Sequence, residues 1–309
     1  MEFLRLLEKI RNPFFDFIFG LITYCGDEII FMAVAIILFW CVSKKEGYYI
    51  LTVGFVGTII NQFLKLAFRI PRPWVKDPNF TIVESAREAA TGYSFPSGHT
   101  QNSVGTFGSI AYGFKQKWLR ITCIVLAILV PFSRMYLGVH TPLDVGVSIG
   151  IALILIFAMR PIINKAEKNP KVMYIFLGSM LLMAVLFVLY VELYNFPNDI
   201  DSHNYASGLK NAYTLLGALL GMIIAYPIES NYIKFEVKDK WYINIIKVAL
   251  GLGLVLGIKA GLKPLLYFIC NNHPCADAIR YMLIVIFAVC VYPLLFPVFR
   301  KIDNKLCKK

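Results

Sequence analysis

The sequence contains few charged residues. Asp, Glu, Lys and Arg make up 16% of its 309 residues, whereas a soluble globular domain carries about 25%. Apolar residues account for 58% of the chain and aromatic residues for 15%. Such a composition excludes an ordinary soluble domain, because too little polar surface is available to cover one. It predicts an integral membrane protein.

The sequence also lacks the cysteine patterns that bind zinc. None of its seven Cys lies in a C-x-x-C pair. Cys41, Cys123 and Cys290 fall within apolar runs. Cys270 and Cys275 are the only plausible disulfide pair, and the sequence leaves open whether the bond forms. We therefore expect no zinc site.

A net charge of +12 would suggest nucleic-acid binding in a soluble chain. Here most Lys and Arg lie in short links between apolar runs, so no nucleic acid is expected. The basic links alternate with the other links, which by the positive-inside rule places the basic ones in the cytoplasm. These links hold Lys44 and Lys45; Lys115, Lys117 and Arg120; Arg160, Lys165, Lys168 and Lys171; Lys234, Lys238 and Lys240; and the tail 300–309. We expect a bacterial plasma membrane with a cytoplasmic C-terminus and the intervening links, including the acidic stretch 192–201, outside.

The apolar runs predict an all-α fold, a bundle of transmembrane helices. About 20 apolar residues cross a bilayer, which places spans near 28–43, 47–68, 98–114, 120–138, 142–160, 172–192, 208–228, 242–262 and 278–299. Residues 4–24 allow either a tenth span or a helix in the membrane interface. The first eleven residues mix charged and apolar residues at helical spacing, which favours an amphipathic helix over a signal peptide.

The segment from Ser133 to Asp144 combines an Arg, a His and an Asp at the mouth of an apolar run. His140 and Asp144 have the i, i+4 spacing that brings side chains together if a helix begins near Thr141, and Pro142 suits the first turn of a helix. Arg134 offers a planar fork of donors suited to phosphate. The segment favours phosphoryl transfer, although a single His beside an Asp is more often a structural pair.

Two further clusters occupy span ends on the same predicted membrane face. One holds Lys65, Arg69 and Arg72, and the other is the run Pro96 to His99. Taken in order, the three clusters resemble the signature K-x6-R-P, P-S-G-H and S-R-x5-H-x3-D of the type 2 phosphatidic acid phosphatase superfamily. The resemblance covers about residues 1–165. It implies a phosphatase core of six helices there, with the amphipathic N-terminal helix, and about four further spans of unknown role in residues 166–309.

The resemblance also implies a role for each matching residue. His140 attacks phosphorus, Asp144 stabilises the resulting imidazolium, and His99 protonates the leaving group before activating water. The phosphate is bound by Lys65, Arg72, Ser97, Gly98 and Arg134. Because cations neutralise the phosphate and the sequence contains no carboxylate cluster, no metal or other cofactor is implied.

The expected substrate is a lipid phosphate whose tail stays among membrane lipids. Phosphatidate or phosphatidylglycerophosphate is favoured; sphingoid-base phosphates and undecaprenyl diphosphate stay open. Two other classes also stay open, a lipid phosphotransferase and a non-enzymatic scaffold or transporter. Intact His99, His140 and Asp144 favour the enzyme, since a scaffold has no need of them. The sequence does not indicate an oligomeric state.

Overall fold

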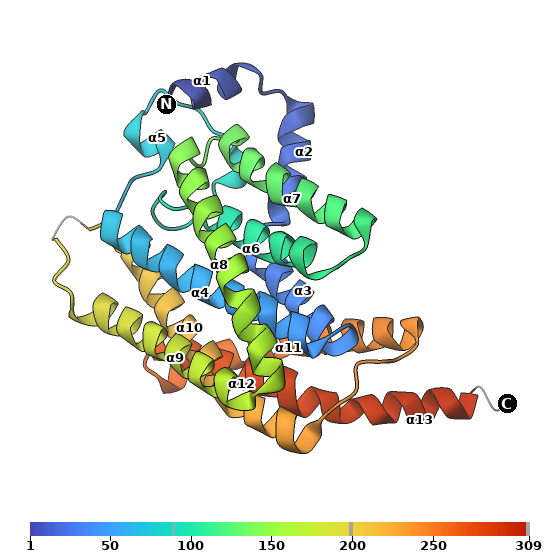
Figure 1. Ribbon diagram of the computed structural model, residues 1–309. Helices are drawn as coiled ribbons and strands as arrows, with labels where there is room; N and C mark the ends of the chain where they lie inside the picture. The colour runs from blue at the N-terminus through green and yellow to red at the C-terminus, as the bar shows by residue number, and fades with distance from the viewer. Residues whose placement is uncertain (89, 198–199, 307–309) are drawn as a thin grey trace. The chain divides into compact units, whose positions relative to one another are not determined.

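The computed structural model describes residues 1–88, 90–197 and 200–306, and within these ranges the chain forms helices and turns without strands (Figure 1). Residues 198–199 of the expected acidic outer link and residues 307–309 of the expected cytoplasmic tail lie outside the described part. The helices are α1 (Glu2–Lys9), α2 (Pro13–Tyr24), α3 (Glu28–Cys41), α4 (Lys44–Phe68), α5 (Pro73–Lys76), α6 (Gly98–Gly113), α7 (Lys117–Tyr136), α8 (Pro142–Lys168), α9 (Pro170–Leu193), α10 (Ser202–Ile228), α11 (Trp241–Ile269), α12 (Cys275–Ile286) and α13 (Phe296–Leu306).

Seven helical segments of the described chain are long and apolar enough to cross a membrane. They run from α4 into α5, through α7, α8, α9, the segment from α10 to Ile233, α11, and the segment from α12 to Lys301. The prediction of an integral membrane protein made of helices is confirmed. The expected span 98–114 corresponds to α6, which has 16 residues and is not among these seven segments.

The N-terminal region differs in detail from the expected span 28–43. Helices α2 and α3 are together long and apolar enough to form one membrane span, and they are bent by 47° at a short break between them. The ambiguous segment 4–24 is divided in two: α1 ends at Lys9, and Asn12 begins α2, where its side chain accepts a hydrogen bond from the Phe15 amide. This is an N-cap followed by proline in the first turn.

The chain divides into two compact units. The first comprises residues 1–35, 49–164 and 195–208, and the second comprises residues 36–48, 165–194 and 209–309. Within the first unit α6 and α2 both pack along α7. All residues of the three sequence motifs belong to this first unit.

The amphipathic helix α1 lies against the link that follows α5. Leu4 and Leu7 form a buried cluster with Phe80 and Ile82. Glu8 accepts hydrogen bonds from the Thr81 amide and hydroxyl, at 2.8 and 2.5 Å. Partial burial alone would raise the pKa of Glu8, but these bonds and one from an Arg lower it to about 2. The polar face of α1 therefore binds the protein's own link between α5 and α6.

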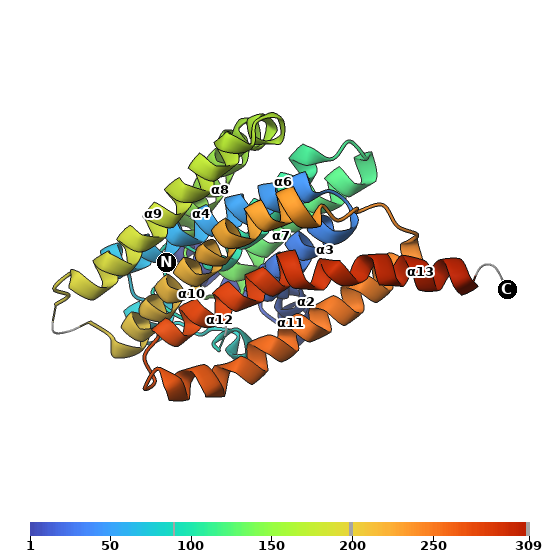
Figure 2. The ribbon, with the colours of Figure 1, turned by 90° about the horizontal axis from the view of Figure 1, so that it is seen from below.

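The second unit contains buried ion pairs. The Asp239 carboxylate contacts the buried ammonium of Lys247 and also accepts a hydrogen bond from Arg300 Nε at 2.5 Å. Figure 2 shows α11 and α12 running side by side in this unit, and a tight turn connects them. Cys270 and Cys275, at the two ends of this turn, are free thiols, so the structure does not contain the disulfide considered from the sequence.

Candidate functional site

The three motifs meet at helix ends in the first unit. Lys65 lies in the last turn of α4, Arg72 directly precedes α5, and Ser97 caps α6. Arg134 lies in the last turn of α7, and Asp144 lies in the first turn of α8. The turn between α7 and α8 carries His140. Six motif side chains are buried in this group, namely Lys65, Arg72, Ser97, Arg134, His140 and Asp144.

The turn that carries His140 depends on Gly138. Its φ of +82° lies in the left-handed region, which residues with a side chain rarely adopt. A Cβ atom there would also lie 2.6 Å from a guanidinium nitrogen of Arg11. Arg11 in turn donates to the carbonyl of Tyr136 at 2.8 Å. The chain that follows α1 thus supports the turn from the outside.

The contacts of His140 define its protonation state. Its Nε2 atom lies 2.9 Å from NH1 of Arg72. Because a guanidinium only donates hydrogen bonds, Nε2 must accept, and the proton of the neutral ring belongs on Nδ1. Nδ1 lies 3.5 Å from Oδ2 of Asp144. The lone pair of Nε2 therefore accepts a hydrogen bond from Arg72, and the buried Nδ1 has no hydrogen-bond partner among the described residues. Arg72 would have to release Nε2 before this atom could act as a nucleophile.

Burial, followed by the positive charges of Arg72, Arg134 and Lys65, lowers the pKa of His140 well below its usual value. Both causes disfavour the imidazolium form. The free site therefore holds His140 neutral at neutral pH. An anion bound among these cations would favour the imidazolium form.

Asp144 caps helix α8 in addition to its contact with His140. Its Oδ2 accepts a hydrogen bond from the Thr141 amide at 2.8 Å, while the Thr141 hydroxyl accepts one from the Asp144 amide at 3.3 Å. This reciprocal pair is a capping box at the start of α8. The same carboxylate oxygen accepts from the Ser94 hydroxyl at 2.6 Å. The helix start expected near Thr141 and Pro142 is confirmed.

Arg134 is held from one side by α2. Its NH1 atom donates to the hydroxyl of Thr23 at 2.7 Å, and both side chains are buried. The buried Nε and NH2 atoms of Arg134 have no hydrogen-bond partner among the described residues. These two atoms form one edge of the guanidinium, the edge that binds an oxyanion through two parallel hydrogen bonds. Arg134 therefore has an edge available for an oxyanion.

Lys65 and Arg72 instead bind main-chain carbonyl groups, most of them in the link between α5 and α6. Lys65 donates to the carbonyl of Tyr93. Arg72 donates to Thr91 at 2.7 Å, to Gly92 at 3.1 Å and to Val139 at 3.0 Å. These bonds fix the link beside the His140 turn. Both cations lie in the buried group, and their hydrogen bonds connect the residues that surround it.

The start of α6 brings Ser97, Gly98 and His99 to the same place. The Ser97 hydroxyl accepts from the Thr100 amide at 3.4 Å, and the Ser97 amide donates to the carbonyl of Asp144 at 3.2 Å. A Cβ atom on Gly98 would meet only the side-chain oxygen of Asn61, at 3.9 Å. The amide of Gly98 therefore lies at an uncrowded helix N-terminus, which favours anion binding.

Thr23, Ser94 and Asn61 are site residues that the sequence interpretation did not identify. Thr23 and Ser94 orient Arg134 and Asp144, whereas both polar atoms of the Asn61 amide are buried and unpartnered among the described residues. Asn61 precedes Lys65 by one helical turn, and an amide inside an apolar run was an available signal. Thr23 gave no such signal, because only the fold brings it to Arg134.

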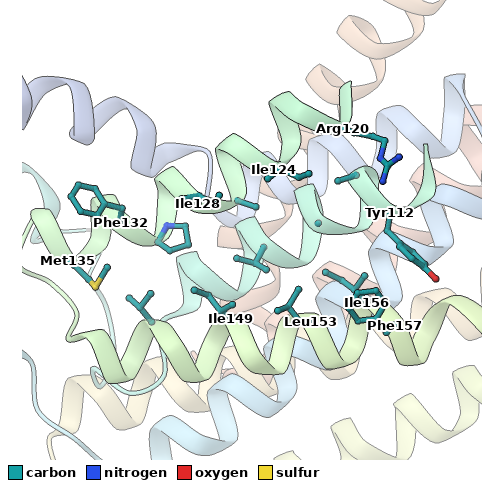
Figure 3. A pocket seen from close by; sticks show the side chains of 16 residues that line it. Tyr112, Arg120, Ile124, Ile128, Phe132, Met135, Ile149, Leu153, Ile156 and Phe157 are labelled. Atoms are coloured by element: carbon teal, nitrogen blue, oxygen red, sulfur yellow. The ribbon is translucent and has the colours of Figure 1, made fainter. Parts of the chain in front are cut away.

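The described residues of the first unit enclose a groove and a smaller cavity. A groove of about 550 Å³ runs between α6, α7 and α8; Figure 3 shows Phe132 and Met135 at one end of its lining and Tyr112 and Arg120 at the other. A smaller cavity of about 310 Å³ lies between α2 and the turn at Ser85 and Ala86, and His99 lines it. No group of three or more His, Cys, Asp or Glu side chains that could hold a metal ion occurs within the described ranges.

Comparisons with known proteins identify two regions. A family model described as PAP2 superfamily matches residues 46–168, and one described as PAP2 superfamily phosphatase, transmembrane extension, matches residues 213–304. Undecaprenyl-diphosphatase BcrC of Bacillus subtilis is 32% identical over 146 residues, which cover 41% of this chain and 72% of the relative. Phosphatidylglycerophosphatase B of the same species is 26% identical over 172 residues, which cover 52% of this chain and 80% of the relative.

A probable sphingosine-1-phosphate phosphatase of Dictyostelium discoideum is 31% identical over 165 residues, which cover 49% of this chain and 39% of that relative. The matched region is thus well under half of that protein. No solved structure matches the chain.

Proposed function

Because the chain belongs to the PAP2 superfamily, we propose that it is an integral membrane phosphatase that hydrolyses a lipid phosphate through a phosphohistidine on His140. One observation carries the proposal. The unprotonated Nε2 of His140 lies beside Arg72, in a buried group that also holds Lys65 and Arg134. A neutral imidazole among three cations suits attack on a phosphate whose charge those cations neutralise.

The proposed reaction has two steps. In the first, Nε2 of His140 bonds to phosphorus, the bond from phosphorus to the ester oxygen breaks, and His99 protonates the leaving oxygen. Asp144, at 3.5 Å from Nδ1, stabilises the imidazolium. In the second, His99 takes a proton from water, which displaces His140 and releases phosphate. Arg134 binds the phosphate oxygens through its open edge, with Lys65, Arg72, Ser97 and the amide of Gly98.

The favoured substrate resembles phosphatidate or phosphatidylglycerophosphate. The similarity to phosphatidylglycerophosphatase B supports this class, while other relatives carry the names of a sphingosine-1-phosphate phosphatase and an undecaprenyl-diphosphatase. Sphingoid-base phosphates and undecaprenyl diphosphate are therefore the next candidates. The proposed site faces the outside of a bacterial plasma membrane, on the basis of the alternating basic links.

A lipid phosphotransferase and a non-enzymatic scaffold are the competing functions. A transferase would use the same phosphohistidine but pass the phosphate to a second lipid, so lipid acceptors would compete with water. A scaffold would not need the buried cations or the available edge of Arg134. Leaving such donors unpaired costs about 1–3 kcal/mol for each buried polar group, which favours a protein that binds an anion there.

The first test is release of inorganic phosphate by the purified full-length protein from a panel of lipid phosphates in detergent, with and without a chelator. We expect metal-independent release and inhibition by vanadate, which can adopt the geometry of the transferring phosphoryl group. The proposed metal-free mechanism would be contradicted by activity that disappears on chelation and returns with magnesium. Failure to hydrolyse any lipid phosphate would reject the proposed function.

The two histidines have separable effects. His140→Ala is expected to abolish turnover, whereas His99→Ala should slow lipid phosphate hydrolysis by about 10²–10⁴-fold. An aryl phosphate has a better leaving group, so His99→Ala should still release a burst of phenol and accumulate phosphohistidine, detectable by mass spectrometry. His203→Ala, which changes an exposed His at the start of α10, is the matched control. A burst in His140→Ala would reverse the two assignments.

A further inference from the structure

The cavity beside α2 differs from the apolar groove of Figure 3 in one respect. Its lining includes His99, whereas the groove between α6, α7 and α8 is lined by none of the residues that the motifs assign to the site. The rest of its lining comes from α2 and from Ser85 and Ala86. Helix α2 lies before residue 46, where the match to the family model begins. The cavity wall is therefore a feature of this chain that the family match does not describe.

Helix α2 presents two neighbouring stripes to this cavity. The first stripe consists of Asp16, Gly20 and Thr23, which recur at helical spacing. Two of them are hydrogen-bonded to α7: Asp16 accepts from the Tyr136 hydroxyl at 2.9 Å, and Thr23 accepts from Arg134. The second stripe consists of Phe17, Leu21 and Tyr24, which are 64%, 52% and 58% exposed. One stripe is anchored to the site and the other forms an apolar rim.

We propose that this cavity receives the leaving alcohol of the substrate, with the ester oxygen at His99 and the hydrocarbon passing over the rim of Phe17, Leu21 and Tyr24 into the membrane. The inference rests on the proposed function, because it assigns His99 to the leaving oxygen.

When the bond from phosphorus to the ester oxygen breaks, its electron pair stays on that oxygen. Burial and the neighbouring Arg134, Arg72 and Lys65 lower the pKa of His99 in the free site, so the bound phosphate, which neutralises these cations, must favour the His99 imidazolium. The oxygen takes the proton of this imidazolium and departs as a neutral alcohol, while phosphorus is bonded to His140.

The size and the lining of the cavity define the class of alcohol. A volume of about 310 Å³ is at the lower end of the range of about 300–1,000 Å³ for ligand pockets. It holds the part of the alcohol next to the oxygen and not a whole lipid. Because Leu21 and Phe17 are exposed on a membrane helix, the remaining chain has an apolar exit. The substrate class is an amphiphilic alcohol phosphate with a long hydrocarbon chain.

Gly20 provides a direct test, since a Cβ atom there would meet nothing within 4 Å. Gly20→Phe should fill the cavity without disturbing the fold. We expect kcat/KM for a long-chain lipid phosphate to fall at least about tenfold. Hydrolysis of acetyl phosphate, whose leaving group is acetate, and inhibition by vanadate should change less than threefold, on the order of 0.6 kcal/mol. Gly178→Phe in α9, another position with nothing within 4 Å, is the matched control.

The outcomes separate this inference from the proposed function. A wild-type protein that hydrolyses no lipid phosphate rejects the function. If the wild type is active, two results reject the cavity as the alcohol site. In the first, Gly20→Phe hydrolyses lipid phosphate as well as the wild type does; in the second, it loses equal activity on lipid phosphate and on acetyl phosphate. If Gly20→Phe does not fold, a long-chain alkylphosphonate with a diazirine beside phosphorus provides the second measurement in the wild type. Crosslinks in α2 or at residues 85–86 support the cavity, and crosslinks confined to the α6–α8 groove overturn it.

Discussion

Thr23 is the side chain through which α2 fixes the guanidinium of Arg134. Thr23→Val keeps the shape and removes the acceptor, so NH1 of Arg134 loses its partner. A hydrogen bond to a charged group contributes about 1.5–3 kcal/mol, so we expect vanadate inhibition to weaken by about 10- to 100-fold. Thr23→Ser should restore it.

Thr52→Val is the control for this effect. Thr52 is also buried, and its hydroxyl donates to the carbonyl of Tyr49 within its own helix α4. A purely structural role for Thr23 would lower the melting temperature in Thr23→Val and leave vanadate inhibition of the folded fraction unchanged. Equal weakening in both valine variants would likewise contradict a positioning role.

The lowered pKa of His140 predicts the acidic side of the pH profile. A His whose pKa is below its usual value stays neutral, and able to attack, down to a lower pH. The acidic limb of kcat/KM that reports the free nucleophile should therefore lie below about pH 6.5, the value of an unperturbed His. The measurement is kcat/KM against pH with an aryl phosphate. A limb centred above pH 7 that persists in His99→Ala would show that His140 is protonated in the free site.

The order and spacing of the motif residues made it possible to predict from the sequence that they lie near one another. Lys65, His99 and Arg134 lie at helix ends because each motif borders an apolar run, and the structure brings them into one unit. The sequence could not indicate that Arg72 binds three carbonyl groups or that Thr23 holds Arg134, since both depend on tertiary contacts. The chemical roles of these residues stay predictions.

At the scale of elements, the break between α2 and α3 packs directly on the start of α6. A Cβ atom on Gly26 would lie 2.7 Å from the carbonyl oxygen of His99 and 2.8 Å from a Val130 methyl group. Gly26→Val should therefore push the bent helix pair away from α6. We expect a loss of stability of about 1–3 kcal/mol and a larger relative loss of activity.

The matched control is Gly253→Val in α11, where a Cβ atom would meet nothing within 4 Å. The measurements are thermal unfolding and phosphate release from the same preparations. Wild-type activity in a stable Gly26→Val protein would show that the contact between the break and α6 is not needed for the site.

The long helices were predictable because an apolar run of about 20 residues has few alternatives to a span. The bent pair was not. Residues 28–43 contain no break, and the bend lies before them, where Gly26 and Asp27 separate two apolar stretches. Asp27 accepts a hydrogen bond from the Ile29 amide and so begins α3. A cap of this kind starts a new helix within a stretch that stays apolar on average, so a hydropathy profile does not reveal the bend.

At the scale of the whole molecule, the distribution of basic links predicts its orientation. In a cysteine-free background, Glu88→Cys should react with a membrane-impermeant thiol reagent on intact cells, and Lys238→Cys should react only after permeabilisation. Both positions are exposed. Labelling of Lys238→Cys alone would invert the topology and exclude an external substrate.

The division of the chain at about residue 165 stays a prediction. The two family models match separate regions, and the two compact units also change at Lys165, although residues 36–48 belong with the second unit. The helices α3 and α4 each contribute to both units. Sequence reasoning could not assign residues 36–48 to the second unit, because hydropathy identifies spans but not the partners they pack against.

Because Asp144 belongs to the capping box at the start of α8, a substitution there would affect the folding of the protein as well as its chemistry. An Ala variant there would lose the contact with His140 and the hydrogen bonds from Thr141 and Ser94 at once. In a living cell, such a variant would reach the proteases that remove unfolded protein, so its abundance would fall together with its turnover. A folded but inactive version for trapping a substrate is therefore better made at His140.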